Sequence, residues 1–190
     1  MRMLAPVLCA LLVAGAAFAA PPEPGDAAAP LEPEDAAGRA LAVPAPGHVM
    51  LLSFASPSTG EAAGEIARAI RVEHPALEIL SFIDLSSFPR LMRGFVRREI
   101  VKRQESALHK TRAAFARAGK TAPDDLAARI HVIPDFDAES GKAYGVGETG
   151  NRPVMVLIGA DGRVKASFES PSFAEVEAAV AREAGSQPPR

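Results

Sequence analysis

The stretch from His48 to Leu85 constrains the fold more than any other part of the chain. It reads HVMLLSFA, then SPSTGEAAGEIARAIRVEH, then PALEILSFIDL. The outer segments are apolar runs of strand length, typical of strands buried on both faces. Between them a helix is expected, capped by Thr59 and stopped by Pro75. Its buried side is expected to carry Ala62, Ile66, Ala69 and Ile70. Short connections predict a right-handed βαβ unit with parallel strands.

The remaining elements extend this unit into an α/β fold. The order after it is a basic helical region over 88–118, a strand in RIHVIPD, a hairpin in RPVMVLIGADGRVKASFES and a last helix in SFAEVEAAVAREAG. Asp161 and Gly162 suit the hairpin turn, because they tolerate positive φ. Ser172 and Glu175 fit a capping box. We therefore expect one domain over 47–184, with a central mixed sheet, flanking helices and a basic helical insertion.

The first 19 residues have the pattern of a signal peptide. A basic start at Arg2 precedes an apolar run that ends in the small residues Ala17 and Ala19. We expect cleavage after Ala19 and export to the periplasm or the medium. An uncleaved inner-membrane anchor stays open, because the apolar run is just long enough to span a bilayer. The only cysteine, Cys9, lies inside this segment. A cleaved chain would then have no disulfide, no thiol catalysis and no thiolate metal site.

Two flanking segments have the composition of loose chain. Residues 20–46 are rich in Pro and Ala, with five acidic residues and one arginine. A chain of this composition can bury only a little apolar surface, which does not offset the conformational entropy lost on ordering. We therefore expect a flexible acidic linker. The last six residues, 185–190, read GSQPPR and are expected to form a disordered tail.

One long segment carries a resemblance to a known family. IPDFDAESGKAYGVGETGNRPVMVLIGADGRV resembles the segment that leads into the hairpin of exported thioredoxin-like reductases and peroxiredoxins. Together with the order of elements, it resembles the thioredoxin-like fold, a three-layer sandwich. The resemblance implies a cis Arg152–Pro153 bond that faces the 56–62 turn. It also places the two thioredoxin cysteines at Thr59 and Ala62, within one residue. Neither is cysteine, and a threonine hydroxyl cannot carry out thiol–disulfide exchange.

The peroxiredoxin part of the resemblance concerns three positions. That group uses T-x-x-C with an arginine beside the hairpin strand. Thr59 and Arg152 match the threonine and the arginine, whereas Ala62 replaces the attacking cysteine. The resemblance implies a vestigial active-site face that could hold an anion or a polar group but not reduce peroxide. Its members are Ser56, Pro57, Ser58, Thr59, Ala62, Arg152 and Pro153. Alternatively, Arg152 is a solvated loop residue.

Hydrolysis and metal binding have weak support. A hydroxyl nucleophile needs a base and an orienting group, and the four histidines are scattered along the chain. The run DFDAE groups three acids after His131, but it lacks the spacing and the glycine of a calcium loop. A solvated turn is the better interpretation. We expect no catalytic residue, no metal and no cofactor.

The basic region forms the second candidate surface. Between Arg90 and Lys120 there are ten Lys or Arg and two acids, in a chain of net charge −2. As a helix its two halves have apolar faces out of phase, so we expect either a break near Arg98 or cover on two sides. Three interpretations stay open: a solvated insertion, a docking surface for an acidic partner, which could include the chain's own acidic linker, or a peripheral contact with anionic lipid. The candidate contact residues are Arg90, Arg93, Arg97, Lys102 and Arg103. Nucleic acid is not expected, because aromatic residues are few.

These features favour an exported thioredoxin-fold domain without thiol redox activity. It would act as a binding or interaction module of the cell envelope, with an envelope protein or an anionic surface as partner. One rival is an atypical oxidoreductase of the antioxidant class, related to thioredoxins and peroxiredoxins. Another is a membrane-surface scaffold that acts through the basic helix.

Overall fold

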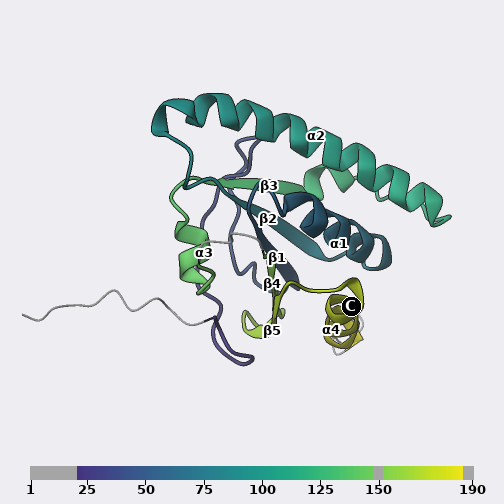
Figure 1. Ribbon diagram of the computed structural model, residues 1–190. Coiled ribbons are helices and arrows are strands. Elements are labelled where there is room, and N and C mark those ends of the chain that lie inside the picture. Colours follow the sequence, from purple (N-terminus) through teal and green to yellow (C-terminus); the bar gives the residue numbers. More distant parts are fainter. Residues whose placement is uncertain (1–20, 148–151, 186–190) are drawn as a thin grey trace, which may run out of the picture.

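The computed structural model describes residues 21–147 and 152–185, and its centre is a five-stranded sheet (Figure 1). The strands lie in the order β3-β2-β1-β4-β5. Their bounds are β1 Met50–Ala55, β2 Glu78–Asp84, β3 Ile130–Asp135, β4 Val154–Ile158 and β5 Val164–Glu169. β1, β2 and β3 pair in parallel, and β4 pairs antiparallel with both β1 and β5. The predicted βαβ unit, hairpin and mixed sheet are confirmed.

Helices cover the sheet on two sides. α1 (Gly60–Glu73) and α4 (Phe173–Gly185) lie on one side of it, and the short α3 (Glu139–Ala143) lies on the other (Figure 1). The long α2 (Arg93–Arg117) follows the 3-10 turn η1 (Arg90–Met92) and runs beside β3 and α1. A second 3-10 turn, η2 (Leu126–Arg129), leads into β3. The basic insertion is thus one long helix at the β3 edge.

Two large apolar clusters form most of the core, one on each face of the sheet, and a third, smaller cluster surrounds Phe115 of α2. All six residues of β1 are buried, because alternate side chains enter opposite clusters. On the α1 and α4 side, Leu51 lies with Ile70 and Val176. On the other side, Phe54 stacks on Phe82, with ring centroids 4.9 Å apart, and lies 5.6 Å from the Tyr144 ring. This explains why the β1 sequence is continuously apolar.

The segment 21–46, which we call the strap, corrects the prediction of a flexible linker. The strap packs on the core cluster that contains Phe54, Phe82 and Tyr144, through the buried side chains of Ala28 and Val43. Leu31 and Val43 exchange backbone hydrogen bonds at 2.9 Å, and the Tyr144 hydroxyl donates to the carbonyl of Ala29 at 2.8 Å. The composition of the segment was misleading, because a few apolar side chains and alanines are enough to hold it on an apolar face of the sheet. The strap therefore belongs to the folded domain.

A buried carboxylate fastens the strap to β3. Asp35 has no exposed surface, and it accepts hydrogen bonds from the Arg39 side chain at 2.7 Å and from two strap backbone N–H groups. His131 Nδ1 of β3 lies 3.1 Å from the same carboxylate. The N–H of Ala36 donates to the carbonyl of Val132 at 2.8 Å, which covers part of the β3 edge.

Helix α1 differs from its predicted orientation. Ala62 is exposed, whereas Ala63, Ala67 and Ile70 are buried, so the helix is turned by about one residue from the expected face. Thr59 occupies the N-cap position, but its side chain makes no cap hydrogen bond. The helix starts at Gly60 because the turn before it closes by hydrogen bonds among its own residues, described below. Only the later part of the predicted face is correct.

Helix α2 is continuous, and its buried residues form one stripe. Val96, Ile100, Thr111 and Phe115 are buried, with Gln104 and Ala107 half-buried between them. These positions recur every three or four residues, so the helix neither breaks near Arg98 nor needs cover on two sides. The prediction failed because polar residues occupy central stripe positions. The hydroxyl of Thr111, for example, donates within the helix to the carbonyl of Ala107 at 2.7 Å.

The predicted signal peptide, residues 1–19, and the predicted tail beyond Gly185 lie outside the described residues. Within the described ranges, no helix combines the length and the apolar character needed to cross a membrane.

Candidate functional site at the carboxyl end of β1

The turn between β1 and α1 is a cluster of hydroxyl groups. The Ser56 hydroxyl lies 2.8 Å from the Ser58 hydroxyl and 3.1 Å from the Thr59 hydroxyl. The Ser56 backbone N–H donates to the Thr59 hydroxyl at 3.0 Å, and the Gly60 N–H donates to the Ser56 carbonyl at 2.9 Å. These hydrogen bonds lie within the turn itself, as expected of residues that start a helix. Pro57 at the tip is exposed.

Arg152 and Pro153 reach the same edge of the sheet through β4. Phe54 of β1 pairs with Val154 of β4, so continuing the register brings Pro153 to the end of β1. The Arg152 side chain is exposed and lies 4.0 Å from the Glu169 carboxylate. Among the described residues, no hydrogen bond or ion pair joins Arg152 to the 56–59 turn. The residues of the vestigial face thus lie at the same edge of the sheet, but hydrogen bonds do not join Arg152 to the 56–59 turn.

The cis bond expected at Arg152–Pro153 is not found. Within 21–147 and 152–185, the one cis peptide bond is Val43–Pro44, in the strap. Pro153 instead continues the extended chain into β4, and its carbonyl accepts a hydrogen bond from the Ser170 N–H at 2.8 Å. A trans bond suits this strand-like path, and most X–Pro bonds are trans.

Asp135 lies beneath this edge and is buried, so the prediction of a solvated DFDAE turn is wrong for this residue, whereas Asp137 and Glu139 are exposed as predicted. The buried Asp135 carboxylate accepts hydrogen bonds from the backbone N–H groups of Glu139, Ser140 and Gly141 at 3.0–3.2 Å, and so starts α3. Burial raises the pKa of Asp135, and the nearby Asp84 carboxylate adds to the rise, against the lowering effect of the three N–H groups. The cavity beside both acids measures about 10 Å³, which is room for one water at most.

The five predicted contact residues of η1 and α2 fall into two groups, those that form an ion pair with a described residue and those that do not. Arg93 forms an ion pair with Asp137 at 2.6 Å and stacks over the Phe136 ring at 5.2 Å. Arg97 lies 3.5 Å from Glu34 of the strap, and Lys102 lies 3.5 Å from Glu99. Arg90 and Arg103 form no ion pair within the described part of the chain. Arg93 therefore holds the start of α2 to the β3–α3 connection.

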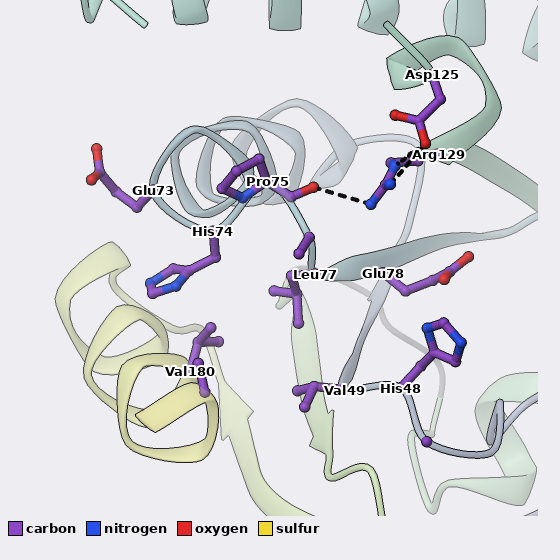
Figure 2. Close-up of a pocket in the computed structure, with 13 residues that line it drawn as sticks. His48, Val49, Glu73, His74, Pro75, Leu77, Glu78, Asp125, Arg129 and Val180 are labelled. Atoms are coloured by element: carbon purple, nitrogen blue, oxygen red, sulfur yellow. Dashed lines mark hydrogen bonds and ion pairs between the residues drawn. The ribbon is translucent and has the colours of Figure 1, made fainter. Parts of the chain in front are cut away.

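A second cavity lies at the opposite end of the sheet and was not predicted. It measures about 840 Å³ and opens between the carboxyl ends of α1 and α4 and the starts of β1 and β2 (Figure 2). Its charged residues already have partners. Arg129 bonds to Asp125 at 2.7 Å, Glu73 to Lys120 at 2.7 Å, and Glu78 lies 3.7 Å from His131. No group of three or more potential metal ligands occurs in the described ranges.

Several solved structures with the same architecture are named as thiol–disulfide proteins. A Chlorobium tepidum protein described as a candidate thiol:disulfide interchange protein DsbE superposes with a TM-score of 0.56 at 13% identity, covering 85% of this chain and 98% of that one. A thiol-disulfide oxidoreductase from Bacteroides fragilis gives 0.53 at 15% identity, covering 83% and 98%. DsbF from Mycobacterium tuberculosis gives 0.51 at 13% identity, covering 80% and 93%. The chain has the thioredoxin-like fold, as its sequence predicted.

Sequence comparison adds no family name. No family model matches the chain, and no curated protein matches it.

Proposed function

We propose that the chain is an exported thioredoxin-fold binding module of the cell envelope that carries out no thiol redox chemistry. The observation that carries the proposal is the β1–α1 turn. A thiolate at this helix start would be the nucleophile of a thioredoxin. Here the turn holds hydroxyls that bond to one another, and Ala62 lies on the exposed side of α1. Cys9 is the only cysteine, and it lies in the segment proposed to be removed.

Export rests on the pattern of the first 19 residues, and it gives a direct prediction. The processed chain recovered from the periplasm or the medium is expected to begin at Ala20, one residue after the A-x-A pair. Amino-terminal sequencing of that chain is the measurement. Recovery of only the unprocessed chain, in the inner-membrane fraction, would support the anchored alternative.

The second prediction concerns redox chemistry. The chain from Ala20 contains every described helix and strand, and it is expected to reduce neither insulin disulfides nor peroxide above a no-protein control. The reason is that the nucleophile in both reactions is a thiolate, which this chain lacks. Turnover by the unmodified protein would support the rival oxidoreductase function and end the proposal.

A double cysteine variant tests the register of the vestigial face. Thr59→Cys/Ala62→Cys places two thiols one helical turn apart at the α1 amino terminus, where the helix dipole favours a thiolate. We expect weak but measurable insulin reduction from this variant. The matched control is Ala178→Cys/Ala181→Cys, with the same spacing on exposed positions of α4 away from its start. Equal turnover by the two variants would show that the β1–α1 turn has no special geometry.

A further inference from the structure

The start of α2 exposes an apolar patch. Four large hydrophobic side chains are exposed in the described parts of the chain, and three of them fall within five residues. Leu91 is 100% exposed, Phe95 60% and Met92 44%; the fourth is Phe173 of α4, at 40%. Clustered exposed apolar residues mark interaction sites, whereas single ones are ordinary. The Arg93–Asp137 ion pair fixes this end of α2 beside the sheet edge that carries the candidate site.

Cations continue the same side of α2 beyond the patch. Leu91, Phe95, Arg98 and Lys102 follow one another at spacings of four, three and four residues, so they share the side opposite the buried stripe. In the η1–α2 region and the residues after it, five arginines form no ion pair with any described residue: Arg90, Arg98, Arg103, Arg112 and Arg117. The only acids within α2 are Glu99 and Glu105. At 100° per residue, Arg98 and Lys102 lie at the centre of this outer face, and Arg112 and Arg117 lie on its flanks. Arg103 lies on the side of Lys110, which pairs with Glu61 of α1. The outer face is therefore apolar at one end, with cations beside the apolar patch and along its flanks.

We propose that the outer face of α2 binds an anionic lipid surface, with Leu91 and Phe95 inserted among the acyl chains and the arginines at the headgroups. The face is the outside of a straight helix of 25 residues, about 37 Å long, rather than a pocket. Its charges are spread along that length, which matches an extended anionic plane better than a compact acidic segment. This inference names the partner of the proposed binding module and depends on the proposed function only in that the chain acts by binding.

Vesicle binding tests the proposal. The chain from Ala20 is mixed with phosphatidylcholine vesicles that either contain or lack phosphatidylglycerol. We expect binding to the anionic vesicles that weakens with added salt, and little binding to the neutral ones. Each cation near an anionic surface strengthens binding about fivefold, so Arg98→Gln/Arg112→Gln is expected to weaken it about 25-fold. Phe95→Ser is expected to weaken it about tenfold, because an apolar ring no longer leaves water.

Matched controls separate this face from general charge and hydrophobicity. Arg163→Gln/Arg182→Gln removes two exposed cations outside α2, and Phe173→Ser removes the remaining exposed ring; both are expected to bind like the unmodified chain. The protein contains no tryptophan, so Phe95→Trp introduces a single reporter. Its emission is expected to shift to shorter wavelength on anionic vesicles, whereas that of Phe173→Trp should not change.

Several results would overturn the proposal, and none depends on the redox assays. Absence of binding to anionic vesicles at low salt would do so, as would equal binding to both vesicle types. Self-association that Phe95→Ser abolishes, without vesicle binding, would assign the patch to a second copy of the chain. Binding of polyglutamate with no binding of vesicles would assign the cations to an acidic protein. Redox turnover together with vesicle binding would overturn the proposed function and leave this inference standing.

Discussion

A chain shortened to begin at Gly47 is expected to lose cooperative thermal unfolding and to aggregate. The truncation removes the strap, which covers the sheet face formed by Leu52, Phe54 and Val156. Burial of a side chain such as Val43 contributes about 1.5–3 kcal/mol, and Leu31, Leu41 and the Asp35 contacts add to it. Together these contributions are comparable with the whole free energy of unfolding of a domain, about 5–15 kcal/mol.

Circular dichroism during heating measures this effect. The control is the chain that begins at Ala20, which keeps the strap and removes only the first 19 residues. It is expected to unfold in one sharp transition. A second measurement adds a peptide of residues 20–46 to the shortened chain, which is expected to recover part of the transition. If the shortened chain and the control unfold at the same temperature, then 21–46 is a linker after all.

The sheet was predictable because its signals are local and redundant. The apolar run of β1 requires burial on both faces, and the helix after it fits only a parallel crossover. The turn at Asp161 and Gly162 likewise fixes the β4–β5 hairpin, because Gly162 adopts the positive φ that such a turn needs. Each of these inferences needs only neighbouring residues. The order of strands then follows from the thioredoxin-like arrangement.

The strap and α2 were mispredicted because their partners lie far away in the sequence. Asp35 is an ordinary acidic residue until His131, 96 positions later, lies beside it. Phe115 packs against Val72 and Leu126 in a small cluster of its own, which a helical wheel of α2 cannot show. The short apolar run ALAV over residues 40–43 was a local signal for the strap. Its proline and acidic content outweighed that signal.

The sequence predicted the position of the candidate site in the fold, but not the orientation of its side chains. The strand end and the helix start located Ser56 to Thr59, because a βα turn lies at the carboxyl edge of a sheet. The burial of Ala63 in place of Ala62, and the three N–H groups that Asp135 accepts, depend on how α1 and α3 settle on the sheet. Sequence spacing leaves such rotations undetermined within one residue.

Asp35→Ala is expected to lower the free energy of unfolding by about 1–3 kcal/mol at neutral pH, because it leaves Arg39 without its ion pair and takes the Asp35 carboxylate from the buried His131, which keeps only Glu78 at 3.7 Å. Burial pushes the pKa of Asp35 up, but hydrogen bonds from the Arg39 backbone, His131 and the Arg39 side chain outweigh this and lower it below its ordinary 3.8. A carboxylate with a lowered pKa stabilises the fold above its unfolded pKa, and this stability is lost as the pH falls through the folded value.

The difference between the unmodified chain and Asp35→Ala should therefore be fully present at about pH 5 and should shrink as the pH falls below about 4. Urea unfolding across this pH range is the measurement. Glu34→Ala, the exposed neighbour that lies 3.5 Å from Arg97, is the matched control and should change stability by about 0.5 kcal/mol or less. A loss that is equal in both variants, or that persists unchanged in acid, would show that the buried carboxylate does not hold the strap. Because the strap covers one face of the sheet that positions Ser56 to Thr59, its attachment through Asp35 is a condition for any binding at that edge.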